Sequence, residues 1–192
     1  MPRVVDRTER LAELAGAVRR VLERDGVEAV TMRNVAAELG CSTGLLTHWV
    51  PDRAGLLLLA LRATADDQTQ RAIEALVRDP LDPMGAVEAF LPLDDARRAD
   101  AKVWFGFWAL ALTHPDLEAE QRARYQGFRE RLVEHLVVLG VDEGAAVIGA
   151  DRIMTTIDGV TVSATFDPEH WTPARQRGVA RATLAEVLAP AT

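Results

Sequence analysis

The chain has 192 residues, of which 48% are hydrophobic and 27% charged, a composition that supports a buried core and excludes a disordered protein. Its single cysteine, Cys41, excludes an internal disulfide and a thiolate metal cluster within one chain. The net charge of −7 is unevenly distributed, because residues 1–62 hold nine Arg against eight Asp or Glu (+1) and residues 63–192 hold 13 Lys or Arg against 21 Asp or Glu (−8). An acidic remainder keeps a protein soluble without preventing its neutral part from approaching an anionic partner.

No apolar run approaches the roughly 18 residues that a membrane-spanning helix needs. The charged start MPRVVDRTER has no apolar signal segment behind it. We therefore expect a cytoplasmic protein that makes no contact with a membrane.

Three helices are predicted in the first 50 residues. Apolar residues at helical spacing (Leu11, Leu14, Val18 and Leu22) mark a helix over 7–25, which ends at Asp25-Gly26. Thr31 is the expected N-cap of a short helix that Gly40 ends, and Ser42 is the expected N-cap of a third helix over 42–50. The third helix is expected to bury Leu45, Leu46, Trp49 and Val50 and to expose Thr43, Gly44, Thr47 and His48.

Longer helices are predicted in the rest of the chain, at about 52–78, 84–90, 95–113, 116–139, 142–166 and 173–189. Breaks rich in Pro, Gly and Asp separate them, and no alternating strand pattern is flanked by turn pairs. The sequence therefore predicts an all-α protein of about nine helices. We expect a three-helix helix-turn-helix domain over 1–52, with the motif at 31–50, and a helical sensing and dimerisation bundle over 53–192.

Residues 31–50 read TMRNVAAELGCSTGLLTHWV and form the pattern with the clearest functional meaning. Two short amphipathic helices joined by a glycine turn give an angled pair whose second member fits the major groove of DNA. The outward groups of the third helix are small or polar and can reach base edges or phosphates. From the pattern alone, a plain helical hairpin remains an equal alternative.

The span from Leu11 to Leu61, with Asp52-Arg53 and Leu56-Leu57 after the motif, resembles the DNA-binding domain of the tetracycline-repressor (TetR) family. Its subtype resembles the choline-responsive betaine-pathway repressors, which residues 103–132 and Ile157-Asp158-Gly159 also resemble. The resemblance implies a ligand-released repressor that binds a palindromic operator as a homodimer. It implies DNA contacts by Thr31, Ser42, Thr43, Gly44, Thr47, His48, Trp49 and Arg53. Trp49 stands where the family usually has Tyr, Val50 replaces a usual Phe, and Pro51 is unusual.

An aromatic cluster in the second half is the other notable pattern. Core packing is one interpretation, and a pocket for an apolar or quaternary-ammonium effector is the other. The candidate pocket residues are Trp104, Phe107, Trp108, Tyr125, Phe128, Met154 and Asp158, with Asp158 as a counter-charge.

The last two predicted long helices are rich in small residues, which permit close helix approach. In the resembled family such a pair forms a four-helix bundle with its twin, whereas packing within one chain is the alternative. The candidate interface residues are Ile153, Ile157, Val160, Thr183 and Val187.

Two other classes of protein have less support in the sequence. The sequence lacks G-x-S-x-G, H-E-x-x-H and a glycine-rich phosphate loop, and its four histidines have no metal-ligand spacing, so neither an enzyme nor a cofactor or metal is expected. A helical adaptor or small-molecule-binding protein that never binds DNA is the other alternative.

Overall fold

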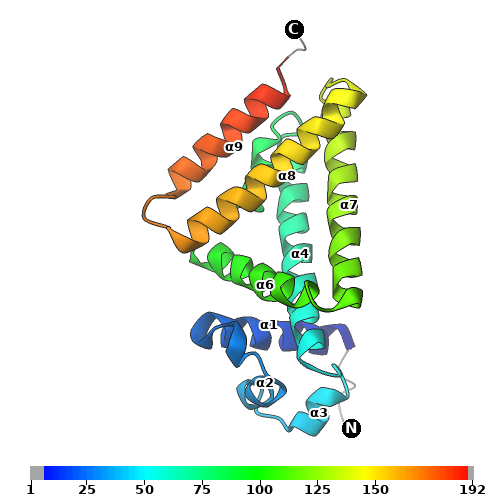
Figure 1. The fold of residues 1–192 in the computed structure, drawn as a ribbon, viewed down its shortest axis with the longest axis vertical. Helices are drawn as coiled ribbons and strands as arrows, with labels where there is room; N and C mark the ends of the chain where they lie inside the picture. The colour runs from blue at the N-terminus through cyan, green and yellow to red at the C-terminus, as the bar shows by residue number, and fades with distance from the viewer. Residues whose placement is uncertain (1–6, 190–192) are drawn as a thin grey trace. The chain divides into compact units, whose positions relative to one another are not determined.

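The computed structural model describes residues 7–189, which form nine α-helices and one 3₁₀ turn and contain no β-strand (Figure 1). The elements are α1 (Arg7–Asp25), η1 (Val27–Ala29), α2 (Met32–Glu38), α3 (Thr43–Thr47), α4 (Arg53–Arg78), α5 (Met84–Glu88), α6 (Asp95–Ala111), α7 (Pro115–Val138), α8 (Glu143–Phe166) and α9 (Pro173–Val187). The predicted all-α class is confirmed. None of these helices is long and apolar enough to cross a membrane.

Most helix boundaries lie close to those predicted, because side chains cap them. The Asp142 carboxylate accepts hydrogen bonds from the backbone at the start of α8, and the Thr172 hydroxyl accepts one at the start of α9. The third helix is shorter than expected, since α3 ends at Thr47, and the 3₁₀ turn η1 was not predicted.

The chain folds into two compact units. The described part of unit 1 comprises residues 7–67 and 102–117, and that of unit 2 comprises residues 68–101 and 118–189. The division differs from the boundary expected after residue 52, because the first part of α4 and the last part of α6 complete the core of unit 1. Both helices continue into unit 2.

Unit 1 is built around apolar residues of α1, α4 and α6 that are at most 1% exposed, including Leu14, Leu22, Leu56, Leu57 and Phe107. Gly106 permits a close approach inside this unit, since a Cβ atom there would lie 2.7 Å from Val27 Cγ2. The helix-turn-helix therefore does not fold on three helices alone. Residues far away in the sequence supply part of its support.

Unit 2 packs α8 and α9 against one another (Figure 1). The small residues Ala146, Gly149 and Ala150 allow this approach on α8 and are buried. A Cβ at Gly149 would lie 2.6 Å from Val187 Cγ1 and 3.2 Å from Leu136 Cδ1. The small-residue pattern noted in the sequence thus serves packing within the chain at this position.

Candidate DNA-binding and ligand-binding sites

The helix α3 exposes a mainly polar surface and is held in place by one buried side chain. Leu46 is 1% exposed, and the Ser42 hydroxyl caps the helix by accepting a hydrogen bond from Leu45 N at 3.2 Å. Thr47 Oγ1 donates to the Gly44 carbonyl at 2.9 Å, which fixes the orientation of its side chain. The exposed residues along α3 and its flanks are Ser42, Thr43, Gly44, Leu45, Thr47 and His48. This surface can enter a nucleic-acid groove while Leu46 stays packed in the core of unit 1.

The helix α2 is held firmly beside α3. Thr31 Oγ1 accepts a hydrogen bond from Asn34 N at 3.2 Å and caps α2, as the sequence predicts. The carboxylate of Glu38 accepts from Arg20 Nε at 2.7 Å and from Arg24 Nη1 at 2.9 Å. These hydrogen bonds lower the pKa of Glu38, so the carboxylate stays ionised and ties α2 to α1.

Two residues expected to contact DNA are occupied inside unit 1. The Arg53 guanidinium donates to the carbonyls of Val30 and Val27, both at 2.9 Å, and so braces the segment before α2. The indole nitrogen of Trp49 is buried without a partner, and its ring packs against the core. In this arrangement two nitrogens of the Arg53 guanidinium are bound within unit 1, and the Trp49 nitrogen is turned away from solvent.

Two other residues of unit 1 were missed by the sequence reasoning. Leu45 was expected to be buried but is 46% exposed, because Leu46 and Val50 define the buried face and Leu45 lies about 100° away from it. An exposed apolar side chain there can contact a thymine methyl group. Arg33 is exposed on α2 and makes no hydrogen bond or ion pair with another described residue, so its charge is available to a phosphate.

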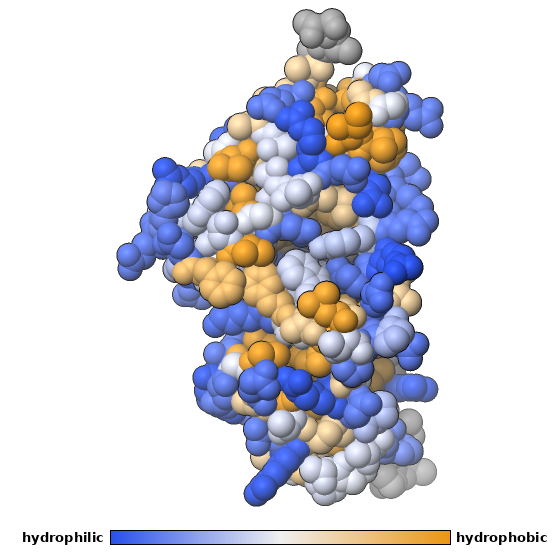
Figure 2. All heavy atoms as spheres, in the orientation of Figure 1, coloured by the Kyte–Doolittle hydropathy of each residue, from blue (hydrophilic) through white to orange (hydrophobic). Residues whose placement is uncertain are grey.

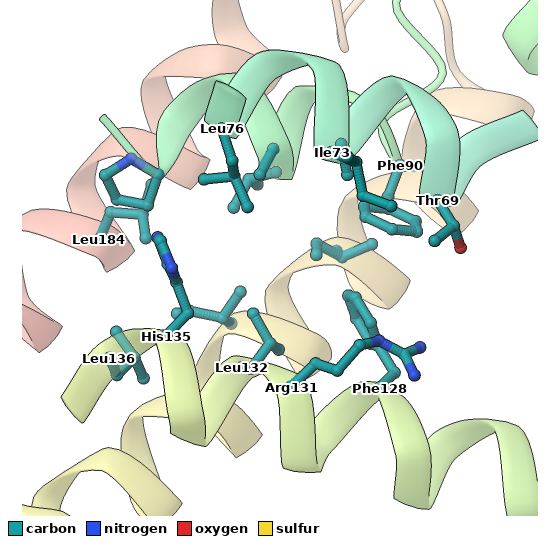
Figure 3. A pocket seen from close by; sticks show the side chains of 16 residues that line it. Thr69, Ile73, Leu76, Phe90, Phe128, Arg131, Leu132, His135, Leu136 and Leu184 are labelled. Atoms are coloured by element: carbon teal, nitrogen blue, oxygen red, sulfur yellow. The ribbon is translucent and has the colours of Figure 1, made fainter. Parts of the chain in front are cut away.

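Unit 2 contains a cavity of about 140 Å³ (Figure 3). Its wall comes from α4, α5, α7, α8 and α9 and from Pro83, which precedes α5. The lining residues are Thr69, Ala72, Ile73, Leu76, Pro83, Ala86, Val87, Phe90, Phe128, Arg131, Leu132, His135, Leu136, Ile153, Ile157 and Leu184. A concave site with a mostly apolar wall and few polar groups is typical of small-molecule binding.

The candidate pocket residues belong to both units. Phe128 lines the cavity and packs against Phe90 with ring centroids 4.8 Å apart. By contrast, Phe107 is 0% exposed in the core of unit 1, where Trp104 and Trp108 pack against the same core. These three residues therefore serve as packing, the alternative left open for the aromatic cluster.

Tyr125 and Asp158 form a separate polar pair in unit 2, and neither lines the cavity. The Tyr125 hydroxyl donates to Asp158 Oδ2 at 2.8 Å. Burial and the nearby carboxylate raise the pKa of Tyr125, and burial also raises the pKa of Asp158 although the hydrogen bond opposes this. Met154 is buried on the same helix as Asp158.

The candidate dimer residues are mostly buried within one chain. Ile153, Ile157 and Val160 are 2%, 7% and 3% exposed and belong to the core of unit 2, as does Val187 at 8%. Thr183 exchanges a hydrogen bond with Thr156 at 3.1 Å between the two hydroxyls. Since their surface is already covered, the four apolar residues offer little area to a second copy.

A different face of α8 is exposed and partly apolar. It comprises Ile148, Thr155, Gly159, Val162 and Phe166, spaced three to seven residues apart and therefore on one side of the helix. Ile148 is 65% and Phe166 79% exposed, and a Cβ at Gly159 would meet nothing within 4 Å. Figure 2 shows hydrophobic side chains among polar ones over this part of unit 2.

Comparison with known proteins identifies relatives of the chain. Residues 82–189 match the family described as "BetI-type transcriptional repressor, C-terminal". The HTH-type transcriptional regulator PksA of Bacillus subtilis is 28% identical over 88% of this chain and 84% of that protein. The HTH-type transcriptional regulator BetI of Burkholderia cenocepacia is 30% identical over 69% of this chain and 70% of that protein.

Solved structures share the fold. A transcriptional regulator from Rhodococcus sp. Rha1 has a TM-score of 0.83 and 27% identity and covers 93% of this chain and 95% of its own. A regulator from Saccharomonospora viridis, solved in complex with choline, has a TM-score of 0.79 and 21% identity over 93% of this chain and 96% of its own. With the exposed α3 surface, these matches show that the chain belongs to the TetR family of DNA-binding transcriptional regulators and carries a BetI-type C-terminal domain.

Proposed function

We propose that the chain is a ligand-responsive repressor that binds a palindromic operator as a homodimer and is released by a small molecule. The exposed α3 surface, held on the packed core of unit 1, is the observation that carries the DNA-binding part. The cavity of unit 2 supports the ligand-binding part. A gel shift with the intergenic DNA upstream of the chain's own gene tests the proposal. Absence of any shift would favour the alternative of a helical adaptor that never binds DNA.

Recognition of the operator sequence should depend on α3. The overall affinity of the protein for DNA should depend on positive charge near α3. We expect Thr47→Ala to reduce discrimination at one base pair per half-site by about 10-fold, because the substitution removes the hydroxyl from the exposed face of α3. We expect Arg33→Gln to weaken all DNA evenly and to flatten the salt dependence, because a phosphate contact releases counterions. Fluorescence anisotropy with operator and scrambled duplexes at several salt concentrations measures both. Two variants that bind like the original protein would contradict the assignment.

The exposed face of α8 is the surface that we propose for the dimer. A two-fold axis through it would place the same helix of both copies in contact, and the palindrome of the operator would mirror that symmetry. The open space at Gly159 would let the partner's helix approach closely. The buried residues named from the sequence would then support this face from behind.

Gly159→Arg is expected to convert the dimer into a monomer, because it places a long charged side chain in the middle of that face. The protomer should stay folded, since the position is helical and nothing in the chain occupies the space. Sedimentation at micromolar concentration should report the 21.0 kDa chain mass for the variant and twice that mass for the original protein. Ala123→Arg, on an exposed position of α7, is the matched control and should remain dimeric. A dimeric Gly159→Arg protein would place the interface elsewhere.

Helix α4 is the element through which we infer that ligand and DNA communicate. It supplies Leu56 and Leu57 to the core of unit 1 and Ala72 and Leu76 to the cavity wall of unit 2. Operator binding requires the two recognition helices of the dimer to reach successive major grooves, which lie about 34–36 Å apart. A ligand weakens operator binding only if it binds more tightly to a dimer in which the spacing of these helices is different. A coupling free energy of about 1–3 kcal/mol would change operator affinity roughly 5- to 150-fold.

Two chemistries of ligand have support in unit 2. A cationic ligand is favoured by Asp158, which pairs with no Arg, Lys or His among the described residues, and by the choline bound to the Saccharomonospora viridis regulator. An apolar ligand is favoured by the cavity. Tyr125, Met154 and Asp158 remain candidates for the first, and Phe128 for the second.

A further inference from the structure

The wall of the unit 2 cavity carries basic groups but no acidic one. Thirteen of its sixteen lining residues are apolar, and Thr69 adds a hydroxyl. The other two are Arg131 and His135, which lie four residues apart on α7 and therefore on the same face of that helix. No Asp or Glu belongs to the lining.

Both basic side chains lack partners within the part of the chain that the structure describes. Nε2 of His135 is buried and has no hydrogen-bond partner. Arg131 forms no hydrogen bond or ion pair with a described residue, although most arginines of α7 pair with a carboxylate, as Arg129 does with Asp151 at 2.7 Å. Figure 3 shows His135 directed into the cavity, whereas the exposed Arg131 extends along α7 toward Phe128 and away from His135. The buried Nε2 of His135 is costly without a partner unless a bound molecule satisfies it, whereas the exposed Arg131 contributes its positive charge.

We propose that this cavity binds a small apolar molecule with a carboxylate at one end, which accepts a hydrogen bond from His135 and is attracted by the positive charge of Arg131. The proposal rests on the proposed function, whose ligand class it specifies. The volume of about 140 Å³ is close to that of an apolar cavity of roughly 150 Å³ that accommodates benzene, so the apolar body has about six carbons. The tilted pair Phe90 and Phe128 offers an aromatic wall for such a body.

A quaternary ammonium ion fits this cavity poorly. Its charge would be desolvated by the apolar wall, and the nearest charged group would be the positive Arg131, because no carboxylate lines the cavity. Asp158, the counter-charge suggested by the sequence, is outside the lining. The same cavity therefore discriminates between ligands of equal size by the sign of their charge.

Three probes with one apolar body test this preference: benzoate, benzyl alcohol and benzylammonium, with choline as a fourth. Calorimetric titration of the full chain is expected to give an affinity for benzoate about 10-fold higher than for benzyl alcohol, with benzylammonium and choline weaker still. Tighter binding of benzylammonium or choline would overturn the proposal. So would binding of none of the four.

Variants of α7 locate the bound carboxylate. Arg131→Gln and His135→Phe are each expected to bring benzoate affinity down toward that of benzyl alcohol and to leave benzyl alcohol affinity unchanged. Arg129→Gln is the matched control, because Arg129 lies on the same helix and does not line the cavity. Equal effects of Arg129→Gln and Arg131→Gln on benzoate would overturn the assignment. Unchanged benzyl alcohol binding also shows that the variants are folded.

A second measurement separates this inference from the proposed function. Calorimetry contains no DNA, so it reports on the cavity alone, whereas a gel shift with added benzoate reports on control of the operator. Benzoate binding without an effect on the operator would support the cavity assignment and contradict ligand control by this site. Operator release by choline but not by benzoate, unchanged in Arg131→Gln, would support ligand control from another part of unit 2 and contradict control through this cavity.

Discussion

Gly44→Glu is expected to abolish operator binding while the protein stays folded. Gly44 lies on the exposed surface of α3, and a Cβ there would approach only Ser42 Oγ, at 3.9 Å. The backbone is helical, so a side chain introduces no strain. A carboxylate in this place would be repelled by the negatively charged phosphates of the DNA. In a dimer the penalty acts at both half-sites, and we expect a loss of affinity of at least about 100-fold.

Three measurements make this expectation specific. Gel shifts should show the loss of operator binding, circular dichroism an unchanged helix content, and sedimentation an unchanged mass. Gly44→Ala should bind within a few-fold of the original protein, and Ala123→Glu, which makes the same charge change on α7, should bind normally. Normal operator binding by Gly44→Glu would mean that α3 does not enter the groove.

Phe107→Ala should lower the free energy of unfolding of unit 1 by about 3–5 kcal/mol. The side chain is fully buried among residues of α1 and α4, and its removal leaves a cavity that the packed helices cannot close. Operator affinity should fall with stability, because this core supports the helix-turn-helix. Urea denaturation followed by tryptophan fluorescence is suited to the test, since Trp49, Trp104 and Trp108 pack against the core of unit 1.

Phe107→Leu, which keeps most of the volume, should cost only about 1 kcal/mol and serves as the control. The sequence offered Phe107 as a pocket residue, and that role makes a different prediction. A Phe107→Ala protein that kept its stability and its operator affinity but lost its ligand response would restore Phe107 to the pocket.

The helices themselves could be predicted because their ends are marked locally. Ser42, Thr31 and Asp142 cap their helices in the structure, and Gly26, Gly40 and Gly140 adopt positive φ after helices, where a side chain would be strained. These signals act over a few residues and are visible in one sequence. The family could be predicted for a related reason, since the motif at 31–50 combines several such signals in order.

The roles of single apolar residues could not be predicted in the same way. Periodicity shows which face of a helix is apolar but not what covers it. Trp108 and Phe128 both lie on apolar stripes, yet one packs in unit 1 and the other lines the cavity of unit 2. Arg53 is a similar case, because only the fold reveals that the carbonyls of Val27 and Val30 already occupy its guanidinium.

The cavity of unit 2 also contributes to the volume change on unfolding. Unfolding eliminates internal voids, so a protein occupies less space unfolded than folded, and pressure favours the smaller state. A cavity of 140 Å³ corresponds to about 80 mL/mol, and whatever part of it holds no water adds to the volume decrease on unfolding. A molecule that fills the cavity removes this difference. A ligand that fills the cavity should therefore also make unit 2 less compressible.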